Sequence, residues 1–236
     1  MIIALSCGRK GSKGFPGKNL YKLGSYPIMA YPIMAANKCS LVDKVYFSSD
    51  CKEQMLAAIL YGVDETFKRP DHLASDSALL EDVYVWLFNK VRSNIPIEFV
   101  VLLMSNAPGI NSKMMEEMIL ILRENEKADS ICTVSKYLEY SPYRMRKIKD
   151  DWLVNWEDCN DEITCDRNSG DPCYIYDCSC AVVRPDCLDY IHEGIPPQKW
   201  LGKKILPYNK YRDVPCLDID SPWQVPQMES WLEKYW

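Results

Sequence analysis

Short apolar runs alternate along this chain with stretches of helical periodicity, and no other feature of the sequence restricts the fold as much. Ile2–Ser6 and Val45–Ser48 predict buried strands, and the continuous apolar run over Glu98–Met104 predicts a strand in the middle of a parallel sheet. Helices are expected between and after these strands, at Ile28–Asn37, Glu53–Tyr61, Ser77–Val91 (with Asp76 or Ser77 as N-cap) and Ser112–Asn125. Strands that alternate with helices predict a layered α/β fold.

The second half of the chain continues this pattern around one irregular segment. Further strands are expected at Ser130–Ser135, Cys173–Arg184, Lys203–Pro207 and Val214–Ile219, and a last helix begins at Ser221-Pro222. Residues 137–172 are polar, contain tryptophans and show no clear period, so we expect an inserted arm rather than a part of the core. Because no linker or low-complexity tract divides the chain, we expect its 236 residues to form a single domain.

Composition and charge exclude several classes of protein. The chain carries 28 basic and 33 acidic residues, a net charge of −5, and lacks the cationic excess of a nucleic-acid coat or a membrane-surface binder. Its longest apolar run, Phe99–Met104, is far shorter than the roughly 20 residues that cross a bilayer. The N-terminal apolar stretch precedes the basic residues and carries no cleavage pattern, which argues against a signal peptide. We therefore expect a cytoplasmic protein with no nucleic-acid or membrane partner.

The chain contains 11 cysteines, a number that is both high and odd. Disulfide-rich secreted scaffolds are usually shorter and carry an even number. The densest stretch, from Cys159 to Cys187, holds no C-x-x-C pair, whereas structural zinc sites usually have such spacing. We therefore expect reduced thiols that act mostly as small apolar core residues.

A loop rich in glycine and basic residues follows the first predicted strand. It places Arg9, Lys13 and Lys18 among four glycines, at positions 8, 11, 14 and 17. Glycine lets backbone N–H groups approach an anion closely, and the cations neutralise it, so the loop suits a di- or triphosphate. The spacings of the P-loop and of the dinucleotide-binding G-x-G-x-x-G motif are both absent. Composition alone leaves a solvated basic turn as the alternative.

Two carboxylates stand at the end of the last predicted strand. Because side chains alternate along a strand, Asp218 and Asp220 share a face, where they could hold Mg²⁺ with substrate phosphates completing the coordination shell. Alternatively, the pair merely ends the strand, and Asp220 caps the helix that begins at Ser221. The two histidines, His72 and His192, show no recognisable spacing to a Ser or Cys nucleophile, so a catalytic triad has no support.

The motifs, taken in order, resemble one family: the CMP-sialic acid synthetases, or acylneuraminate (nonulosonate) cytidylyltransferases. The resemblance extends over nearly the whole chain, and its most specific part is the loop R-x-G-S-K-G-x-P-x-K-N at Arg9–Asn19. The other matching segments are Val45–Asp50, Arg69-Pro70, Leu73–Asp76, Phe99–Met104, Asp129–Ser135 and Asp218–Asp220.

The resemblance implies a Rossmann-like three-layer α/β/α sandwich with a mostly parallel sheet, of the nucleotide-diphospho-sugar transferase type. It also implies a homodimer, in which residues 137–172 are a dimer-forming insertion that reaches toward the neighbour's site. The implied partners are CTP and a sialic-acid-like sugar acid, and the implied cofactor is Mg²⁺. The sugar hydroxyl would attack the α-phosphorus of CTP in line, and pyrophosphate would leave.

The resemblance also assigns roles to individual residues. The catalytic candidates are Arg9, Lys13, Lys18 and Asp218, with the three cations binding the triphosphate. The nucleotide-binding candidates are Arg9, Gly11, Ser12, Lys13, Asn19, Arg69 and Ala78, of which the last two would line the cytosine pocket. Asp218 and Asp220 are the candidate ligands for Mg²⁺.

The part of the family pattern that faces the sugar is altered in this chain. Met104–Ile110 stands where the family commonly reads Q-P-T-S-P-L-R, and Asp177-Cys178 stands where an Asn-Gly pair is usual. Leu79 and Leu80 replace residues that commonly carry hydroxyls beside the base. Arg144 stands where the family usually has a lysine near the insertion, and Arg167 is an approximate match to an arginine of the arm. The resemblance thus gives as sugar-binding candidates Met104, Asn106, Arg144, Arg167 and Asp177. We expect an acceptor other than plain N-acetylneuraminate.

Two other functions remain open from the sequence. The first is a nucleotidyltransferase of the same fold that joins another nucleoside triphosphate, such as GTP, to a sugar or a sugar-1-phosphate. The second is a non-catalytic nucleotide-binding homologue, although a chain without turnover has no need of Asp218 and Asp220 as a metal-binding pair.

Overall fold

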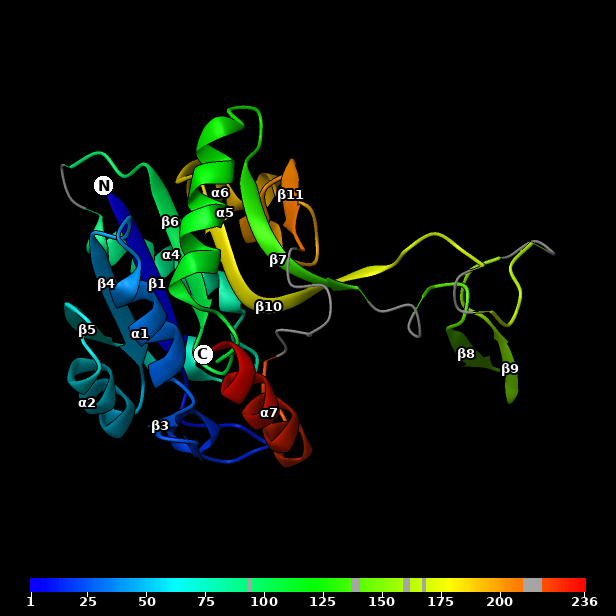
Figure 1. Cartoon of the computed structure of the whole chain (residues 1–236), viewed down its shortest axis with the longest axis horizontal. Coiled ribbons are helices and arrows are strands. Elements are labelled where there is room, and N and C mark those ends of the chain that lie inside the picture. Colours follow the sequence, from blue (N-terminus) through cyan, green and yellow to red (C-terminus); the bar gives the residue numbers. More distant parts are fainter. Residues whose placement is uncertain (93–94, 137–140, 159–161, 167–168, 210–217) are drawn as a thin grey trace.

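The computed structural model describes residues 1–92, 95–136, 141–158, 162–166, 169–209 and 218–236. Within these residues, a central sheet of seven strands has helices on both faces, and a long arm extends from one side (Figure 1). The strands of the sheet are β1 (Ile2–Gly8), β4 (Lys44–Ser49), β5 (Glu65–Lys68), β6 (Phe99–Met104), β7 (Ser130–Lys136), β10 (Tyr174–Val183) and β11 (Ile205–Tyr208).

The strand order across the sheet is β11-β7-β10-β6-β1-β4-β5. β1 pairs in parallel with both β4 and β6, β4 with β5, and β7 with β11. In the described part of this sheet, only β10 runs antiparallel to its neighbours, β6 and β7. The prediction of a mostly parallel sheet is therefore confirmed.

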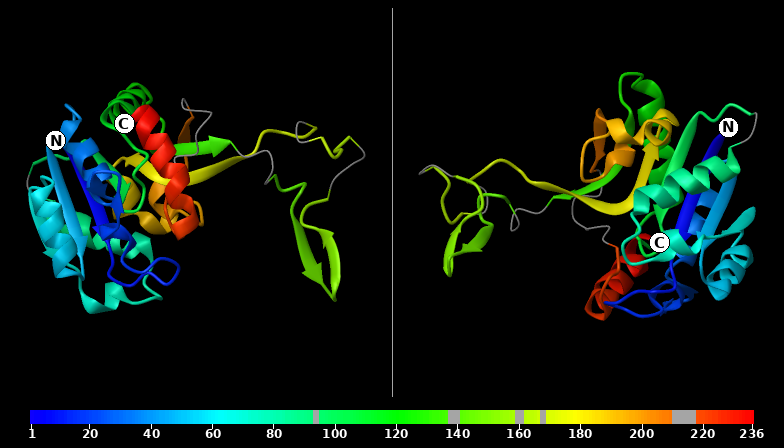
Figure 2. Two further views of the ribbon diagram at one scale, coloured as in Figure 1. Left: turned by 60° about the horizontal axis from the view of Figure 1, so that its bottom comes forward. Right: turned by 180° about the vertical axis from the view of Figure 1, so that it is seen from behind.

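The core lies on both faces of the central strands. Val101 and Leu103 of β6 pack on the side of the helices α1 (Ala30–Lys38), α5 (Ser112–Glu124) and α7 (Val225–Tyr235). Val100 and Leu102 pack on the side of α4 (Leu80–Val91). A strand covered on both faces needs a continuous apolar run, which is the pattern that the sequence shows here. The three layers are visible in two opposite views (Figures 1 and 2).

The remaining helices are shorter or lie at the edges. They are α2 (Lys52–Leu60), α3 (Asp71–Ala74) and α6 (Asp186–Asp189). Two minor hairpins, β2 (Lys22–Leu23) with β3 (Tyr26–Pro27) and β8 (Arg146–Lys149) with β9 (Trp152–Asn155), lie outside the main sheet. No helix in the described part of the chain combines the length and the apolar character needed to cross a membrane.

The predicted start of the helix at Ser77 is wrong. α4 begins at Leu80 with Leu79 as its N-cap. Asp76, one of the two expected N-caps, binds the side chains of Arg9 and Lys13 instead. By contrast, α5 begins where the sequence predicts, because the Asn111 side chain accepts a hydrogen bond from the backbone N–H of Met114 at 3.0 Å.

The end of the chain differs in detail from the prediction. Of the strand expected at Val214–Ile219, residues 214–217 lie outside the described part, and Ile219 belongs to no strand. The last helix opens as expected: Ser221 and Gln224 form a capping box at the 3-10 turn Pro222–Gln224, which leads into α7.

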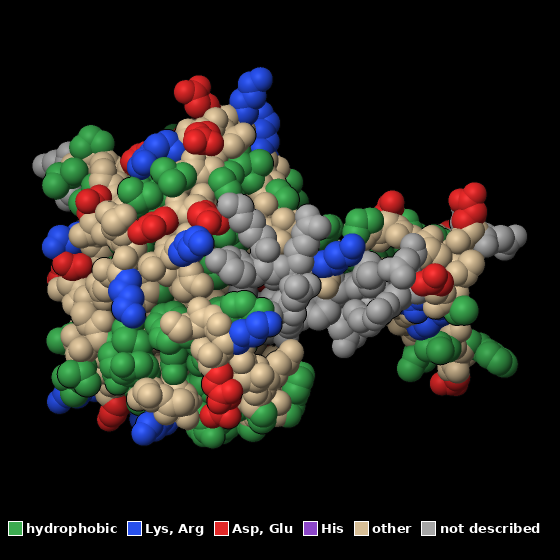
Figure 3. Space-filling view, viewed as in Figure 1, with side chains coloured by type: hydrophobic (Ala, Val, Ile, Leu, Met, Phe, Trp, Pro, Cys, Tyr) green, Lys and Arg blue, Asp and Glu red, His purple; other side chains and the backbone are tan. Residues whose placement is uncertain are grey.

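The hairpin β8–β9 is the regular element in the described residues of the arm. Asp150 and Asp151 form its turn with φ angles of 51° and 66°, the left-handed geometry that two-residue hairpin turns require. Hydrophobic side chains stand on its surface (Figure 3), among them Ile148, Trp152 and Leu153, with Trp152 75% exposed. In the described residues of the arm, these large apolar side chains are exposed rather than packed in a core.

Most cysteines with a described side chain lie in the core of the body. They are Cys7, Cys39, Cys51, Cys132, Cys180 and Cys187, whereas Cys165 on the arm is exposed. Burial raises the pKa of the Cys7, Cys39 and Cys180 thiols, so these side chains stay neutral and act as apolar residues.

Candidate functional site

A pocket of about 610 Å³ opens at the carboxyl ends of β1 and β6. Open α/β sheets place their ligand sites at this edge. The pocket brings together candidate residues from the first loop, the middle and the end of the chain: Arg9, Gly11, Ser12, Lys13, Lys18, Asn19, Arg69, Ala78, Met104, Asn106, Asp218 and Asp220.

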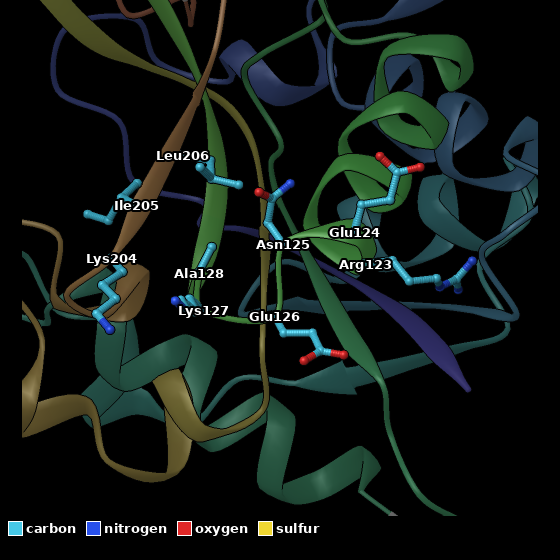
Figure 4. Close-up of a pocket in the computed structure, with 9 residues that line it drawn as sticks. All are labelled: Arg123, Glu124, Asn125, Glu126, Lys127, Ala128, Lys204, Ile205 and Leu206. Carbon is cyan, nitrogen blue, oxygen red and sulfur yellow. The ribbon is translucent and has the colours of Figure 1, made fainter.

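A second pocket, of about 690 Å³, lies at the opposite edge of the sheet, between the end of α5 and the start of β11 (Figure 4). Its lining mixes charges of both signs, and Arg123 is bound by Glu98 through distances of 2.6 and 2.9 Å. None of the predicted site residues lines it. The candidate site is therefore the pocket at the carboxyl ends of the strands.

The glycine-rich loop is fixed by polar side chains of neighbouring elements. Gln54 of α2 donates a hydrogen bond to the carbonyl of Arg9 at 3.1 Å, and Asp50 accepts one from the backbone N–H of Lys10 at 2.8 Å. A Cβ atom at Gly8 would stand 2.3 Å from Oε1 of Gln54, so only glycine allows this close approach. No local sequence pattern indicates the role of Gln54, because its partner is a backbone atom 45 residues away.

Each of the three candidate cations of the loop, Arg9, Lys13 and Lys18, lies against a carboxylate. Arg9 and Lys13 share Asp76, with N–O distances of 2.9 and 2.8 Å, and Lys18 is bound to Asp220. Lys13 first, and then Arg9, holds the pKa of Asp76 below its usual range. The sequence assigns Asp76 to a family motif and makes it a candidate helix N-cap, but it does not predict that Asp76 lies in the site.

The floor of the pocket carries a buried guanidinium without a carboxylate partner among the described residues. Arg69 is 4% exposed, and its Nη2 donates a long bond of 3.4 Å to the carbonyl of Ser48. Its Nε and the Oδ1 of Asn19 are both buried without a hydrogen-bond partner. Buried polar atoms normally find partners, so these two mark a surface built to meet a ligand.

The acidic pair lies at the mouth of the same pocket. Nδ2 of Asn106 lies 3.0 Å from Oδ2 of Asp218 and 3.3 Å from Oδ1 of Asp220. The backbone N–H of Ile219 donates to the carbonyl of Asn106 at 2.8 Å, which joins this segment to the end of β6. Burial, and next the charge of Asp220, raise the pKa of Asp218 to about 6.

Two adjacent carboxylates that repel each other fit a divalent cation. Mg²⁺ usually takes one or two protein carboxylates and completes its octahedral shell with water and substrate phosphates. The described residues form no cluster of three or more His, Cys, Asp or Glu side chains, so such a cation would need those outer ligands. The chemistry of Asp218 and Asp220 therefore fits a magnesium ion that arrives with a polyphosphate.

Two of the described sugar-binding candidates, Asp177 and Arg144, do not line this pocket. Asp177 is 4% exposed and turns into the sheet, where it accepts hydrogen bonds from Thr133 Oγ1 at 2.5 Å and Ser135 Oγ at 2.8 Å. Arg144 lies on the arm and donates to the carbonyl of Cys165 at 2.6 Å. Arg167 lies outside the described residues. Of the four sugar-binding candidates that the structure describes, Met104 and Asn106 line the pocket.

Known proteins are similar to this chain in sequence. The cytidylyltransferase family model matches residues 3–164. The CMP-N,N'-diacetyllegionaminic acid synthase of Legionella pneumophila is 29% identical over 170 residues, which cover 71% of this chain and 72% of that protein. Post-translational flagellin modification protein B of Campylobacter coli is 39% identical over 77 residues, so the similarity spans only 33% of the length of each.

A solved structure is similar in fold over the whole chain. It is a CMP:2-keto-3-deoxy-manno-octonic acid synthetase complexed with CTP, with a TM-score of 0.71 and 14% identity, and the match covers 100% of this chain and 99% of that one. At this identity the likeness concerns the architecture alone. It agrees with the Rossmann-like α/β sandwich described above.

Proposed function

This chain belongs to the cytidylyltransferase family, and we propose that it transfers CMP from CTP to a keto-sugar acid of the nonulosonate type, with release of pyrophosphate. The observation that carries the proposal is the shared pocket: Arg9, Lys13 and Lys18 from the start of the chain face Asp218 and Asp220 from its end. A pocket with cations on one side and a carboxylate pair on the other suits a magnesium-bound polyphosphate.

The loop cations bind the triphosphate and neutralise the charge of the departing pyrophosphate. Phosphoryl and nucleotidyl transfer depend mainly on positioning and charge stabilisation, which these side chains supply together with the backbone N–H groups of the glycine loop. Mg²⁺, when held by Asp218 and Asp220, supplies further positive charge beside the phosphates. Arg69 and the backbone near Ala78 line the same pocket and receive the base.

The acceptor is proposed to be a nonulosonic acid other than N-acetylneuraminate. The name of the Legionella relative supports this class. The altered segment Met104–Ile110 supports it as well, because Met104 and Asn106 line the pocket where the family commonly has Q-P-T.

A homodimer completes the proposal. The hydrophobic side chains on the arm, Ile148, Trp152 and Leu153, are exposed in the single chain and would be buried against a second copy. In such a dimer the arm carries Arg144 to the partner's pocket rather than to its own.

The proposal is tested by incubating the protein and Mg²⁺ with each of the four nucleoside triphosphates and a panel of sugar acids. The panel contains N,N'-diacetyllegionaminic acid, N-acetylneuraminate and 2-keto-3-deoxy-manno-octonic acid, and the products are identified by mass. We expect a CMP-sugar and pyrophosphate from CTP only. Product from GTP or UTP would refute the choice of base, and full activity confined to N-acetylneuraminate would refute the choice of acceptor.

The same assay tests the acidic pair. The double variant Asp218→Asn/Asp220→Asn is expected to lose at least about 99% of the activity, as removal of a catalytic charge site usually does, and to keep its circular dichroism spectrum. The matched control is Glu124→Gln/Glu126→Gln, which removes two charges with the same spacing at the opposite edge of the sheet. Survival of turnover in the Asp variant would show that the metal assignment is wrong.

A further inference from the structure

We propose that Asp76 is an affinity-setting residue of this pocket: its carboxylate occupies the place between Arg9 and Lys13 that a substrate phosphate must take. This inference rests on the proposed function, because it concerns the same polyphosphate site. It goes further, since it assigns a competing role to a residue that does not itself bind the nucleotide.

The geometry shows one carboxylate serving two cations. Oδ1 of Asp76 lies 2.9 Å from Nη1 of Arg9, and Oδ2 lies 2.8 Å from Nζ of Lys13. A phosphate group presents oxygens to Arg and Lys with the same sign of charge and similar hydrogen-bond lengths. The carboxylate therefore occupies the two cations in the way that a phosphate would.

The ion pairs stand at the mouth of the pocket, where they can exchange. The side chain of Asp76 is 58% exposed, and that of Lys13 is 81% exposed. Exposed ion pairs are weak, with a typical strength of about 0–1 kcal/mol, so a polyphosphate with several charged oxygens can displace the carboxylate. Arg69 on the pocket floor, by contrast, has no carboxylate partner among the described residues and needs no such exchange.

The backbone holds Asp76 close to its partners. Asp76 lies between α3 and α4, in a turn where the N–H of Ala78 donates to the carbonyl of Ser75 at 3.3 Å. The carbonyl of Ser75 also accepts from Nη1 of Arg9 at 3.4 Å. A group tethered in this way competes at a high effective concentration, which a free monovalent anion in solution cannot match.

Asp76 therefore lowers the affinity for every ligand that uses Arg9 and Lys13, and leaves other ligands unaffected. CTP and inorganic tripolyphosphate belong to the first group. Cytidine, which has no phosphate, belongs to the second. The carboxylate thus restricts the loop to polyanions that can displace it.

The test compares Asp76→Asn with the wild-type protein by isothermal titration calorimetry, using CTP, tripolyphosphate and cytidine in separate titrations. The substitution keeps the size of the side chain but not its charge, so CTP and tripolyphosphate are expected to bind about three- to tenfold more tightly, the factor for two exposed ion pairs of ordinary strength. Cytidine binding is expected to remain unchanged, which also shows that the variant is folded. Asp76→Glu, which restores the carboxylate, is expected to return the affinity toward the wild-type value.

Asp71→Asn is the matched control. It removes one charge from an exposed position five residues earlier, outside the pocket lining, and is expected to change none of the three affinities. Unchanged or weaker binding of tripolyphosphate by Asp76→Asn would overturn the inference, because Asp76 would then support the loop rather than compete with the ligand. A wild-type protein that binds tripolyphosphate but not CTP would refute the proposed function alone, and the comparison with tripolyphosphate would still decide the role of Asp76.

Discussion

At the scale of single residues, Asp177 shows how burial determines what a carboxyl group does. It was predicted to face a sugar, but the hydroxyls of Thr133 and Ser135 and the backbone N–H of Ser179 surround its oxygens. Burial raises the pKa of Asp177, and these hydrogen bonds offset only part of that effect. The group therefore binds its proton more tightly in the folded protein than in the unfolded chain.

The raised pKa of Asp177 predicts that the free energy of unfolding depends on pH. As the pH rises from the unfolded pKa, about 3.9, through the raised folded pKa, the wild-type protein loses stability, because the native state must give up a proton that it holds tightly. Asp177→Asn has no such proton. We expect the free energy of unfolding of the variant, relative to that of the wild type, to increase between about pH 4.5 and pH 8 in urea titrations. A difference that stays constant over this range would contradict the assignment.

The residues of the site were predictable from the sequence to different degrees. The loop cations were predictable because the loop follows β1 directly, and the carboxyl ends of parallel strands meet at the edge where ligands bind. Asp218 and Asp220 line the same pocket, although the described residues show no strand at this position. The contacts of Asp76 and Asp177 were not predictable, because each depends on a side chain from a segment at least 42 residues away. A local sequence pattern indicates helix or strand periodicity and helix caps. It does not indicate which residues distant in the sequence will contact a loop residue.

At the scale of elements, the glycine loop depends on its contact with α2. Gly8 is the last residue of β1 and lies against the side-chain amide of Gln54. The Nε2 of this amide donates a hydrogen bond to the carbonyl of Arg9. Asn19 donates from Nδ2 to Oε1 of the same Gln54 at 3.2 Å. The two ends of the loop are thus bound to one buried side chain.

Gly8→Ala tests this arrangement. The new Cβ would stand 2.3 Å from Oε1 of Gln54 and 2.7 Å from Nδ2 of Asn19, so both amides must move. We expect the free energy of unfolding to fall by about 1–3 kcal/mol, the usual cost of overpacking, and CTP to bind more weakly. Urea denaturation and calorimetry measure the two effects. Gly11→Ala is the control for stability, since a Cβ there meets nothing within 4 Å, and equal stability losses in the two variants would contradict the prediction.

The positions of the strands along the chain were predicted better than the parallel or antiparallel course of each strand in the sheet. The runs at Phe99–Met104 and Ser130–Lys136 are strands, as their composition indicates. The antiparallel course of β10, with its register shift between Tyr176 and Ala181, could not be foreseen, because the pattern of a buried strand is the same in both directions. The late start of α4 was missed because Asp76 binds the glycine loop instead of a helix end.

At the scale of the whole molecule, the body and the arm differ in how far they bury their apolar side chains. The body buries both faces of its sheet, whereas the arm exposes Trp152 and Leu153 on a two-stranded hairpin. An isolated hairpin of this kind is marginally stable at best in water. The arm therefore needs a partner surface, for which the proposed dimer provides a second copy of the chain.

The dimer predicts an effect of arm substitutions on assembly. Trp152→Glu/Leu153→Glu is expected to convert a dimer into monomers in sedimentation experiments, because each large side chain contributes about 1.5–3 kcal/mol when it is buried. Activity is expected to fall as well, since Arg144 no longer reaches the partner's pocket. Leu60→Glu on α2, which is equally exposed on the body, is expected to leave assembly unchanged. A monomeric wild-type protein would contradict this prediction at once.

The pairing of Arg9 and Lys13 with Asp76 has a consequence for how the protein responds to the ionic composition of its surroundings. Because a carboxylate of the same chain already neutralises these cations, they hold little chloride that a nucleotide would have to release. Dissolved ions weaken the ion pairs of Asp76 with Arg9 and Lys13, which raises the affinity for a nucleotide. They also weaken the contacts of these cations with the nucleotide, which lowers that affinity. Nucleotide affinity is therefore expected to fall less steeply with rising ionic strength than the number of basic residues in the loop suggests.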